Sequence, residues 1–176
     1  MNDILLGNGF FWDELPPGMR FRSRARTITE SDLVNFVNLS WLNEELFTNA
    51  HERQDMAIAG RVVPGALVYA CAEGLLTPSM QGTGLAFLNA ELDIDGPTFV
   101  GDTIHVECEV IERRATSRPG RGLVRTRNTV VNQHGKAVLT YTPLRMMRMR
   151  DAAKERQSPA EAGLMQDPTK RASPAT

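Results

Sequence analysis

The sequence has little of what several common functions require. Its 176 residues include two cysteines and three histidines, and 20 Lys and Arg residues against 21 Asp and Glu leave a formal net charge of −1. This balance gives no electrostatic case for binding nucleic acid or an anionic membrane. The longest apolar run is broken by Glu73 and Gly74, well short of the roughly 20 residues that a membrane-spanning helix needs. One domain of ordinary size is expected.

The few cysteines and histidines exclude further chemistry. Cys71 falls in an apolar segment and Cys108 at an inward strand position, so we expect two buried thiols in a reducing compartment, with no disulfide and no nucleophile. His51 lies in a charged run, His105 on the outward side of a strand and His134 in a turn, so no metal site is expected. The N-terminus has no basic and apolar leader, which predicts a cytoplasmic protein.

The most informative stretch that is present is GRVVPGALVYACAEGLL, residues 60–76. Pro64 suits the first position of a helix, and the following residues are apolar on nearly every side. Such a helix must be wrapped by other structure, and the strand-like sequence after it predicts an antiparallel sheet. The amides at the helix start would then be a place to hold a developing negative charge.

The chain divides into three parts. We expect an arm over residues 1–18, attached to the body by the aromatic residues 10–12, one domain over residues 19–150, and a flexible tail over residues 151–176, which has little to bury. The domain is predicted to contain a helix capped by Thr29 and ending near Ser40, and strands over residues 21–27, 85–94, 104–110, 123–132 and 136–149, the last two joined by a hairpin at residues 133–135.

One helix followed by a long antiparallel meander is the element order of a hot-dog fold, an α+β fold in which an antiparallel sheet wraps a central helix. The sequence resembles the MaoC-like family of (R)-specific enoyl-CoA hydratases and dehydratases over most of residues 21–148. The resemblance is carried by RTITESD at residues 26–32, GRVVPG at 60–65, EGLL at 73–76, and VGDTI at 100–104 leading into VIERR at 110–114. It implies a protein that acts on or binds an enoyl-CoA or 3-hydroxyacyl-CoA, with coenzyme A as part of the substrate and no other cofactor.

The sequence departs from this family at the positions that usually carry catalysis. The family signature is an Asp, then Asn-Pro, with a His five places after the Asp, and these two positions fall on Leu42 and Phe47. Neither side chain exchanges a proton, so the usual hydration cannot run through them. Pro64 stands where a His commonly precedes the helix glycine, and Glu73 stands where the family often has a serine.

Gly65 retains the family pattern, in which its backbone amide polarises the thioester carbonyl. Close packing of the helix against the sheet is the alternative explanation of this glycine. Val63 and Pro64 beside it, and Leu42 and Phe47 at the lost catalytic positions, are the other candidate substrate-binding residues.

Glu73 is the first candidate catalytic residue. A carboxylate in an otherwise apolar helix has a raised pKa unless it is paired, which suits a general base working near neutral pH. A structural ion pair with one of the many arginines is the alternative. Gly65 and Glu73 are separated by roughly 12 Å along a helix, too far to serve one carbonyl atom.

Asn43, Glu44 and Glu45 are the remaining polar residues where the lost signature should be, and they are further catalytic candidates. A register shift could let one of them replace the missing Asp, with Glu44 the first choice, and a solvated turn that opens a short helix is the alternative. Arginines at positions 113, 114, 118, 121, 125 and 127 either meet the phosphates of coenzyme A or form a solvated strand edge.

Three functions remain open at this stage. The first is a MaoC-like hydratase or dehydratase, the second a hot-dog acyl-CoA thioesterase using Glu73, and the third a non-catalytic thioester-binding subunit. Because a single hot-dog domain leaves its sheet edge uncovered, we also expect a homodimer with the two sheets joined edge to edge and a site at the interface.

Overall fold

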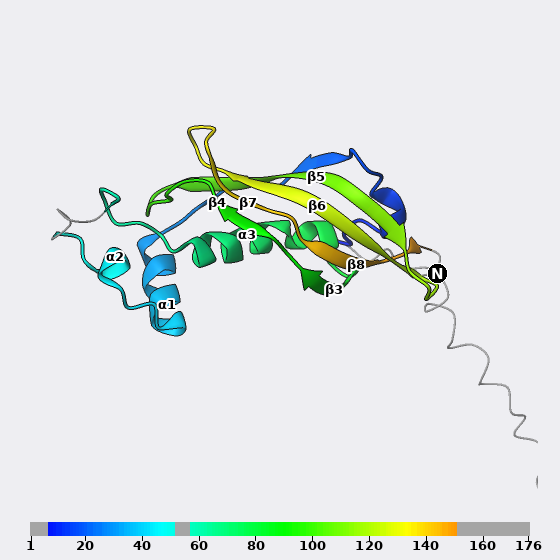
Figure 1. The fold of residues 1–176 in the computed structure, drawn as a ribbon, viewed down its shortest axis with the longest axis horizontal. Helices are drawn as coiled ribbons and strands as arrows, with labels where there is room; N and C mark the ends of the chain where they lie inside the picture. Colours follow the sequence, from blue (N-terminus) through cyan, green and yellow to red (C-terminus); the bar gives the residue numbers. More distant parts are fainter. Residues whose placement is uncertain (1–6, 52–56, 151–176) are drawn as a thin grey trace, which may run out of the picture.

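The computed structural model of the protein describes residues 7–51 and 57–150. Figure 1 shows a long helix lying along one face of a curved antiparallel sheet. The elements in chain order are η1 (Trp12–Glu14), β1 (Arg20–Arg22), β2 (Arg26–Thr27), α1 (Glu30–Ser40), α2 (Glu45–Thr48), α3 (Gly65–Met80), β3 (Gly84–Asn89), β4 (Leu92–Ile94), β5 (Thr103–Ala115), β6 (Arg121–Val131), β7 (Ala137–Tyr141) and β8 (Leu144–Arg148). Over the described ranges, no helix has the length and apolar character needed to cross a membrane. The predicted tail over residues 151–176 lies outside the described residues.

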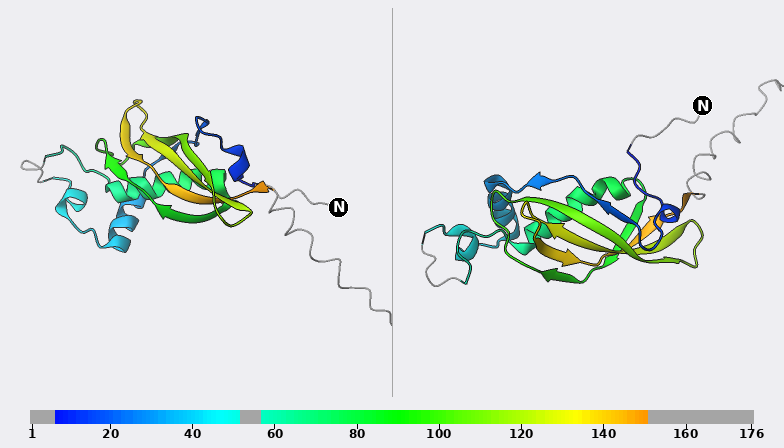
Figure 2. Two further views of the ribbon diagram at one scale, coloured as in Figure 1. Left: turned by 45° about the vertical axis from the view of Figure 1, so that its right-hand side comes forward. Right: turned by 90° about the horizontal axis from the view of Figure 1, so that it is seen from above.

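The sheet has the strand order β1-β5-β6-β7-β4, with β2 also paired to β5, and β8 paired to both β6 and β3. All of these pairings are antiparallel. The two longest strands, β5 and β6, form its centre, and α3 lies against their inner side (Figures 1 and 2). The α+β architecture predicted from the sequence is therefore confirmed.

Three predicted strands are each divided in two. Residues 21–27 form β1 and β2, residues 85–94 form β3 and β4, and residues 136–149 form β7 and β8. At the first break, the Ser23 hydroxyl accepts a hydrogen bond from the Val106 amide at 2.9 Å. A side-chain oxygen therefore replaces a backbone carbonyl as the acceptor between the two strands. At the last break, Pro143 has no amide to donate to a neighbouring strand.

The central helix differs from its prediction at both ends. Pro64 is its N-cap and α3 begins at Gly65. The helix also continues through Pro78 to Met80, although proline usually breaks or kinks a helix. Because Pro78 stands in the last turn, the missing amide removes one hydrogen bond at a place where the helix ends anyway. The N-terminal arm covers this end, since the amide of Phe10 donates to the Ser79 carbonyl at 2.8 Å.

The first helix and the longest strand agree with their predictions. The Thr29 hydroxyl accepts a hydrogen bond from the Asp32 amide at the start of α1, and an Asp32 carboxylate oxygen accepts one from the Thr29 amide. This reciprocal cap fixes the helix start. Along β5, residues 104, 106, 108 and 110 are buried and the residues between them are more exposed, as the period of two predicts.

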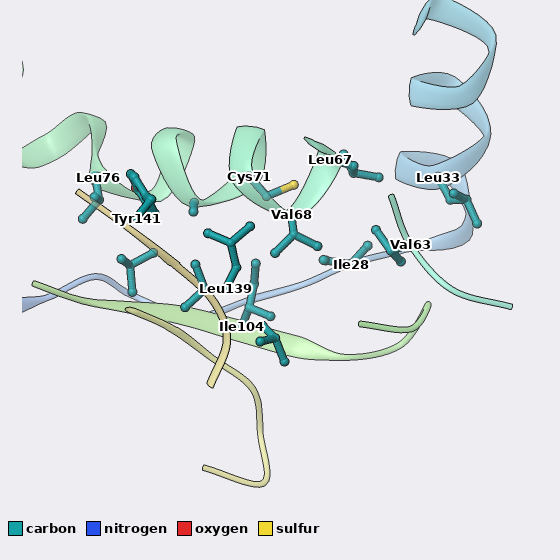
Figure 3. Packing of buried hydrophobic residues seen from close by; sticks show 14 of the residues in the cluster. Ile28, Leu33, Val63, Leu67, Val68, Cys71, Leu76, Ile104, Leu139 and Tyr141 are labelled. Carbon is teal, nitrogen blue, oxygen red and sulfur yellow. The ribbon is translucent and has the colours of Figure 1, made fainter. Parts of the chain in front are cut away.

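The core lies between α3 and the sheet. Figure 3 shows Val68, Ile104 and Leu139 in the layer between the helix and the strands. Ile104 and Leu139 are fully buried, and burial of an aliphatic side chain of this size is worth about 1.5–3 kcal/mol. The wrapped helix expected from the sequence is thus the centre of the hydrophobic core.

The N-terminal arm is attached to the domain by close packing. A Cβ atom on Gly9 would lie 2.5 Å from backbone atoms of Ser79 and Met80, so only glycine fits there. Trp12 donates its indole N–H to the Leu123 carbonyl at 3.1 Å. The arm therefore covers the C-terminal end of α3, at the opposite end of the helix from α1 and α2 (Figure 1).

Candidate functional site

A cavity of about 350 Å³ lies at the start of α3. Its walls come from α2, from the segment that enters α3, from the turn after β4 and from β7. The lining residues are Leu46, Phe47, Ile58, Val62, Val63, Gly65, Val68, Ile94, Asp95, Gly96, Pro97, Thr98, Val138 and Leu139. An apolar cavity that meets the exposed amides of a helix start is suited to an apolar group that carries a polarisable carbonyl.

Gly65 forms the tightest point of this cavity. A Cβ atom at position 65 would lie 2.6 Å from Cδ1 of Ile94 on β4. Ile94 itself is 57% exposed, so its side chain has room to rotate away. The absence of a side chain at Gly65 therefore serves close packing against Ile94. It also leaves the amides of Gly65 and Ala66 uncovered, because the first amides of a helix have no acceptor within it, and the Pro64 carbonyl already accepts from Leu67 at 2.9 Å.

The walls carry one ionisable side chain among the described residues, that of Asp95. Its carboxylate accepts a hydrogen bond from the Thr140 hydroxyl at 2.7 Å. Thr140 lies between Leu139 and Tyr141, which are both buried against the core. Val138, which shares a strand face with Thr140, also belongs to the core and lines the cavity. Asp95 is therefore the one acid or base in the lining among the described residues, and the Thr140 hydroxyl already donates to it.

The predicted substrate-binding residues come together only in part. Phe47, Val63 and Gly65 line the cavity, although they come from different segments. Pro64 is fully buried beneath them, and Leu42 is half-buried without being part of the lining.

Asn43 and Glu44 lie on the surface outside this cavity. Glu44 is the N-cap of α2, and its backbone carbonyl accepts hydrogen bonds from the amides of Phe47 at 2.9 Å and Thr48 at 3.1 Å. This arrangement agrees with the alternative for these residues, a solvated turn that opens a short helix.

Glu73 lies in the second half of α3 and takes part in a network with the sheet. Its Oε1 atom accepts a hydrogen bond from the Tyr141 hydroxyl at 2.7 Å and one from Arg145 Nη2 at 2.6 Å. The guanidinium of Arg145 also lies over the ring of Phe87 at 5.1 Å. The Glu73 and Arg145 side chains are 24% and 12% exposed, so this is a largely buried and fully paired charge. The arrangement agrees with the structural ion pair that was the alternative for Glu73.

The network also sets the acidity of its tyrosines. Burial raises the pKa of Tyr141, and the Glu73 charge raises it further. Burial raises the pKa of Tyr69 as well, followed by the effect of Glu73. Both tyrosines therefore stay protonated near neutral pH, and Tyr141 acts as a hydrogen-bond donor to the carboxylate.

Sequence reasoning did not single out Tyr141 and Arg145. A signal for Tyr141 was present, because it falls on the inward side of the alternating strand that contains Leu139, and a buried tyrosine hydroxyl usually has a partner. The partner itself could not be read from the sequence, since Tyr141 and Glu73 are 68 positions apart in the chain.

Three of the basic residues of the β5–β6 hairpin have side-chain partners within the protein. Arg113 lies over the Trp12 ring at 4.5 Å, Arg114 is 3.4 Å from Glu112, and Arg125 donates to the Thr142 carbonyl at 3.0 Å. None of the six arginines proposed for phosphate binding lines the cavity at the start of α3. Their contacts favour the strand-edge interpretation.

The cysteines and histidines lie as the sequence indicates. Burial raises the pKa of both thiols, that of Cys108 to about 12, so neither is a ready nucleophile. His105 Nε2 is 3.4 Å from a carboxylate oxygen of Glu107. Within residues 7–51 and 57–150, no three His, Cys, Asp or Glu side chains gather as a metal site would require.

Comparisons with known proteins agree with this geometry. No family model matches the chain. A mesaconyl-CoA hydratase of Cereibacter sphaeroides is 40% identical over 63 residues, which cover 36% of this chain and 18% of the relative. An (R)-specific enoyl-CoA hydratase of Rhodospirillum rubrum is 29% identical over 103 residues, which cover 58% of this chain and 69% of the relative. The chain thus spans about a fifth of the first relative and about two thirds of the second.

Solved structures give the fold. A MaoC domain protein of Chloroflexus aurantiacus matches with a TM-score of 0.79 at 23% identity, covering 94% of this chain and 46% of that one. A Mycobacterium tuberculosis protein with a double hot-dog fold matches with a TM-score of 0.69 at 23% identity, covering 83% of this chain and 46% of that one. The antiparallel sheet around α3 and these matches define a hot-dog protein. Within that class the chain resembles MaoC-like proteins, and in sequence it is similar to the two hydratases.

Proposed function

We propose that this protein is of the enoyl-CoA hydratase type and binds an acyl-CoA thioester in the cavity at the start of α3. The apolar walls formed by Phe47, Val63 and Val68 would hold the acyl group. The first amides of α3 would then meet the thioester carbonyl, where backbone donors in comparable sites are worth about 2.7–4 kcal/mol. The names of the two curated relatives support this substrate class, and the observation that carries the proposal is the cavity beside Gly65.

Asp95 is the one ionisable side chain in the cavity walls among the described residues, and its carboxylate already accepts a hydrogen bond from Thr140. This favours one alternative, a thioester-binding subunit that is not itself catalytic. Leu42 and Phe47 stand at the two positions where the family usually has its catalytic pair, and neither exchanges a proton. The thioesterase alternative needs Glu73 as a free base, but its Oε1 atom already accepts two hydrogen bonds and Glu73 does not line the cavity. We therefore propose binding of the thioester first, and catalysis only as a second possibility to be tested.

We also propose that the protein forms a homodimer through the edge of its sheet. Among the described strands, β3 pairs with β8 alone, so its other edge is open. Large apolar side chains are exposed along β3 and β4, namely Leu85, Phe87, Leu88, Leu92 and Ile94. An open and apolar edge is a template for pairing with another chain. The two double-length structural neighbours, each about half matched by this chain, support an assembly of two such domains.

Four measurements on the purified protein test these proposals. Calorimetric titration with crotonyl-CoA and hexanoyl-CoA should show saturable binding, and failure to bind either compound would contradict the proposed site. Loss of the conjugated enoyl absorbance would show hydration, whereas release of free thiol from hexanoyl-CoA would show hydrolysis. Binding without turnover of either kind supports the non-catalytic alternative. Sedimentation should give a dimer at micromolar concentration, and a monomer there would count against edge pairing.

A further inference from the structure

Arg61 joins three segments that meet at the cavity. It lies in the segment that enters α3, and its Nε atom donates a hydrogen bond to the Phe47 carbonyl of α2 at 2.8 Å. Its Nη2 atom is 2.6 Å from a carboxylate oxygen of Glu30 in the first turn of α1. The Arg61 side chain is 27% exposed. A guanidinium is suited to this task because its donors point in fixed directions within one plane.

The α2 helix depends on such outside contacts. It is four residues long, Glu45–Thr48, and none of its residues is buried. A helix of four residues is not stable on its own, because forming the first helical turn costs free energy that so few hydrogen bonds do not recover. Phe47 packs against the hydrophobic core, and Leu46 and Phe47 form one wall of the cavity. The position of this wall is therefore set by the apolar contacts of α2 and by the hydrogen bond from Arg61.

We infer that Arg61 is a positioning residue for the thioester site, because it holds the backbone of Phe47 in place and so fixes the α2 wall of the cavity. It does not line the cavity itself, so it acts through Phe47 and touches no ligand there. The identity of the ligand rests on the proposed function, whereas the attachment of α2 by Arg61 is a property of the free protein.

Hydrogen exchange of single amides tests the attachment. In Arg61→Ala, exchange at Phe47, Thr48 and Asn49 should become about tenfold faster, the change that accompanies a loss of about 1.4 kcal/mol. Arg61→Lys should give a smaller increase, because an ammonium group cannot reproduce the two directed contacts. Arg26→Ala is the matched control. It removes another partly exposed partner of α1, since Arg26 pairs with Asp32, and leaves α2 untouched.

Binding then tests the consequence for the site. Arg61→Ala should weaken crotonyl-CoA binding at least fivefold and hexanoyl-CoA binding less, because a displaced wall widens the cavity and penalises the shorter acyl group. Arg26→Ala should leave both affinities unchanged. Unchanged exchange at Phe47–Asn49 in both Arg61 variants would overturn the attachment. Faster exchange with equal loss for both acyl groups, or with no loss, would overturn the positioning role. If the wild-type protein binds neither compound, the proposed function fails, and the exchange result still decides the attachment.

Discussion

The two ends of the central helix are built differently. At its start, Gly65 borders a largely apolar cavity whose one ionisable side chain among the described residues, that of Asp95, is bonded by Thr140. Two turns further on, Glu73 is paired with Arg145 and Tyr141. The arm covers the far end of the helix through Gly9 and Phe10. The start of α3 thus leaves space for a ligand, whereas the rest of the helix is covered by residues that pack against it or form hydrogen bonds with it.

The sequence placed two candidate functional residues, Gly65 and Glu73, on one helix, and the structure shows that they lie in different surroundings. A carboxylate among apolar residues is a signal for either chemistry or structure, because both uses need a charged group away from water. Its partners decide between the two uses, and both hydrogen bonds to Glu73 come from the sheet. The charge therefore ties α3 to β7 and β8, and the substrate proposal rests on the apolar end alone.

The largest expected effect is on stability at the charged end. Arg145→Ala leaves the Glu73 carboxylate with the Tyr141 hydroxyl as its remaining hydrogen-bond donor among the described residues, and removing one partner of a buried pair typically costs about 3–5 kcal/mol. Because these side chains are partly exposed, we expect a loss of about 3 kcal/mol, measured by urea unfolding. Acyl-CoA affinity should stay the same, since neither residue lines the cavity.

A double variant sharpens this prediction. Glu73→Gln combined with Arg145→Met removes both charges and keeps an amide oxygen to accept the Tyr141 hydrogen bond, so it should recover most of the lost stability. If Arg145→Ala destabilises the protein by less than about 1 kcal/mol, the pair behaves as a surface ion pair, and the structural explanation of Glu73 weakens.

The next effect concerns the open end of the helix. Gly65→Ala places a methyl group where Ile94 Cδ1 now packs, and the exposed Ile94 side chain moves aside at little cost. We expect the free energy of unfolding to change by less than about 1 kcal/mol, because alanine also favours the helix. The methyl group covers the first amides, so acyl-CoA affinity should fall about tenfold, a change of about 1.4 kcal/mol, measured by calorimetry.

Gly74→Ala is the matched control for that substitution. It lies on the same helix, and a Cβ atom there would meet nothing within 4 Å. It should stabilise the protein by about 0.5–1 kcal/mol and leave acyl-CoA affinity unchanged. Equal loss of binding in both variants, or large destabilisation by Gly65→Ala with normal binding, would favour close packing as the whole reason for Gly65.

Alkaline pH probes the closed part of the core. Burial raises the pKa of Cys108 to about 12, whereas an unfolded thiol titrates at about 8.5. Between these values the unfolded chain loses a proton that the folded chain keeps, so stability falls as pH rises. Urea unfolding under reducing conditions should show a loss of about 1 kcal/mol or more between pH 8 and pH 10. Cys108→Ala should reduce this slope, and an unchanged slope would remove Cys108 as its source.

The sequence predicted those parts of the fold that depend on local patterns. The cap at Thr29 and the alternation along residues 104–110 are confirmed, and at residues 133–135 the amide of Asn132 bonds the Lys136 carbonyl at 2.9 Å across the turn. Breaks within strands were missed because their causes are distant, as where Ser23 bonds Val106. The same distinction between local patterns and distant contacts applies to the candidate site. Gly65 and Phe47 were singled out through family positions, whereas the partners of Glu73 and the role of Arg61 depend on how separate segments meet.

The smallest expected effect lies at the start of α1, where the cap was predicted from sequence alone. Hydrogen bonds from the Thr29 backbone and side chain lower the pKa of Asp32, so its contribution to stability is present above the ordinary carboxyl pKa of about 3.9 and disappears as pH falls through the lower folded value. Asp32→Asn should cost about 0.5 kcal/mol at pH 7, as expected for an anion in the first turn of a helix, and the difference from wild type should shrink below pH 3. Parallel urea titrations of the two proteins at pH 7 and pH 2.5 measure both values. A difference that persists at pH 2.5 would mean that the side-chain geometry of residue 32, and not its charge, stabilises the helix start.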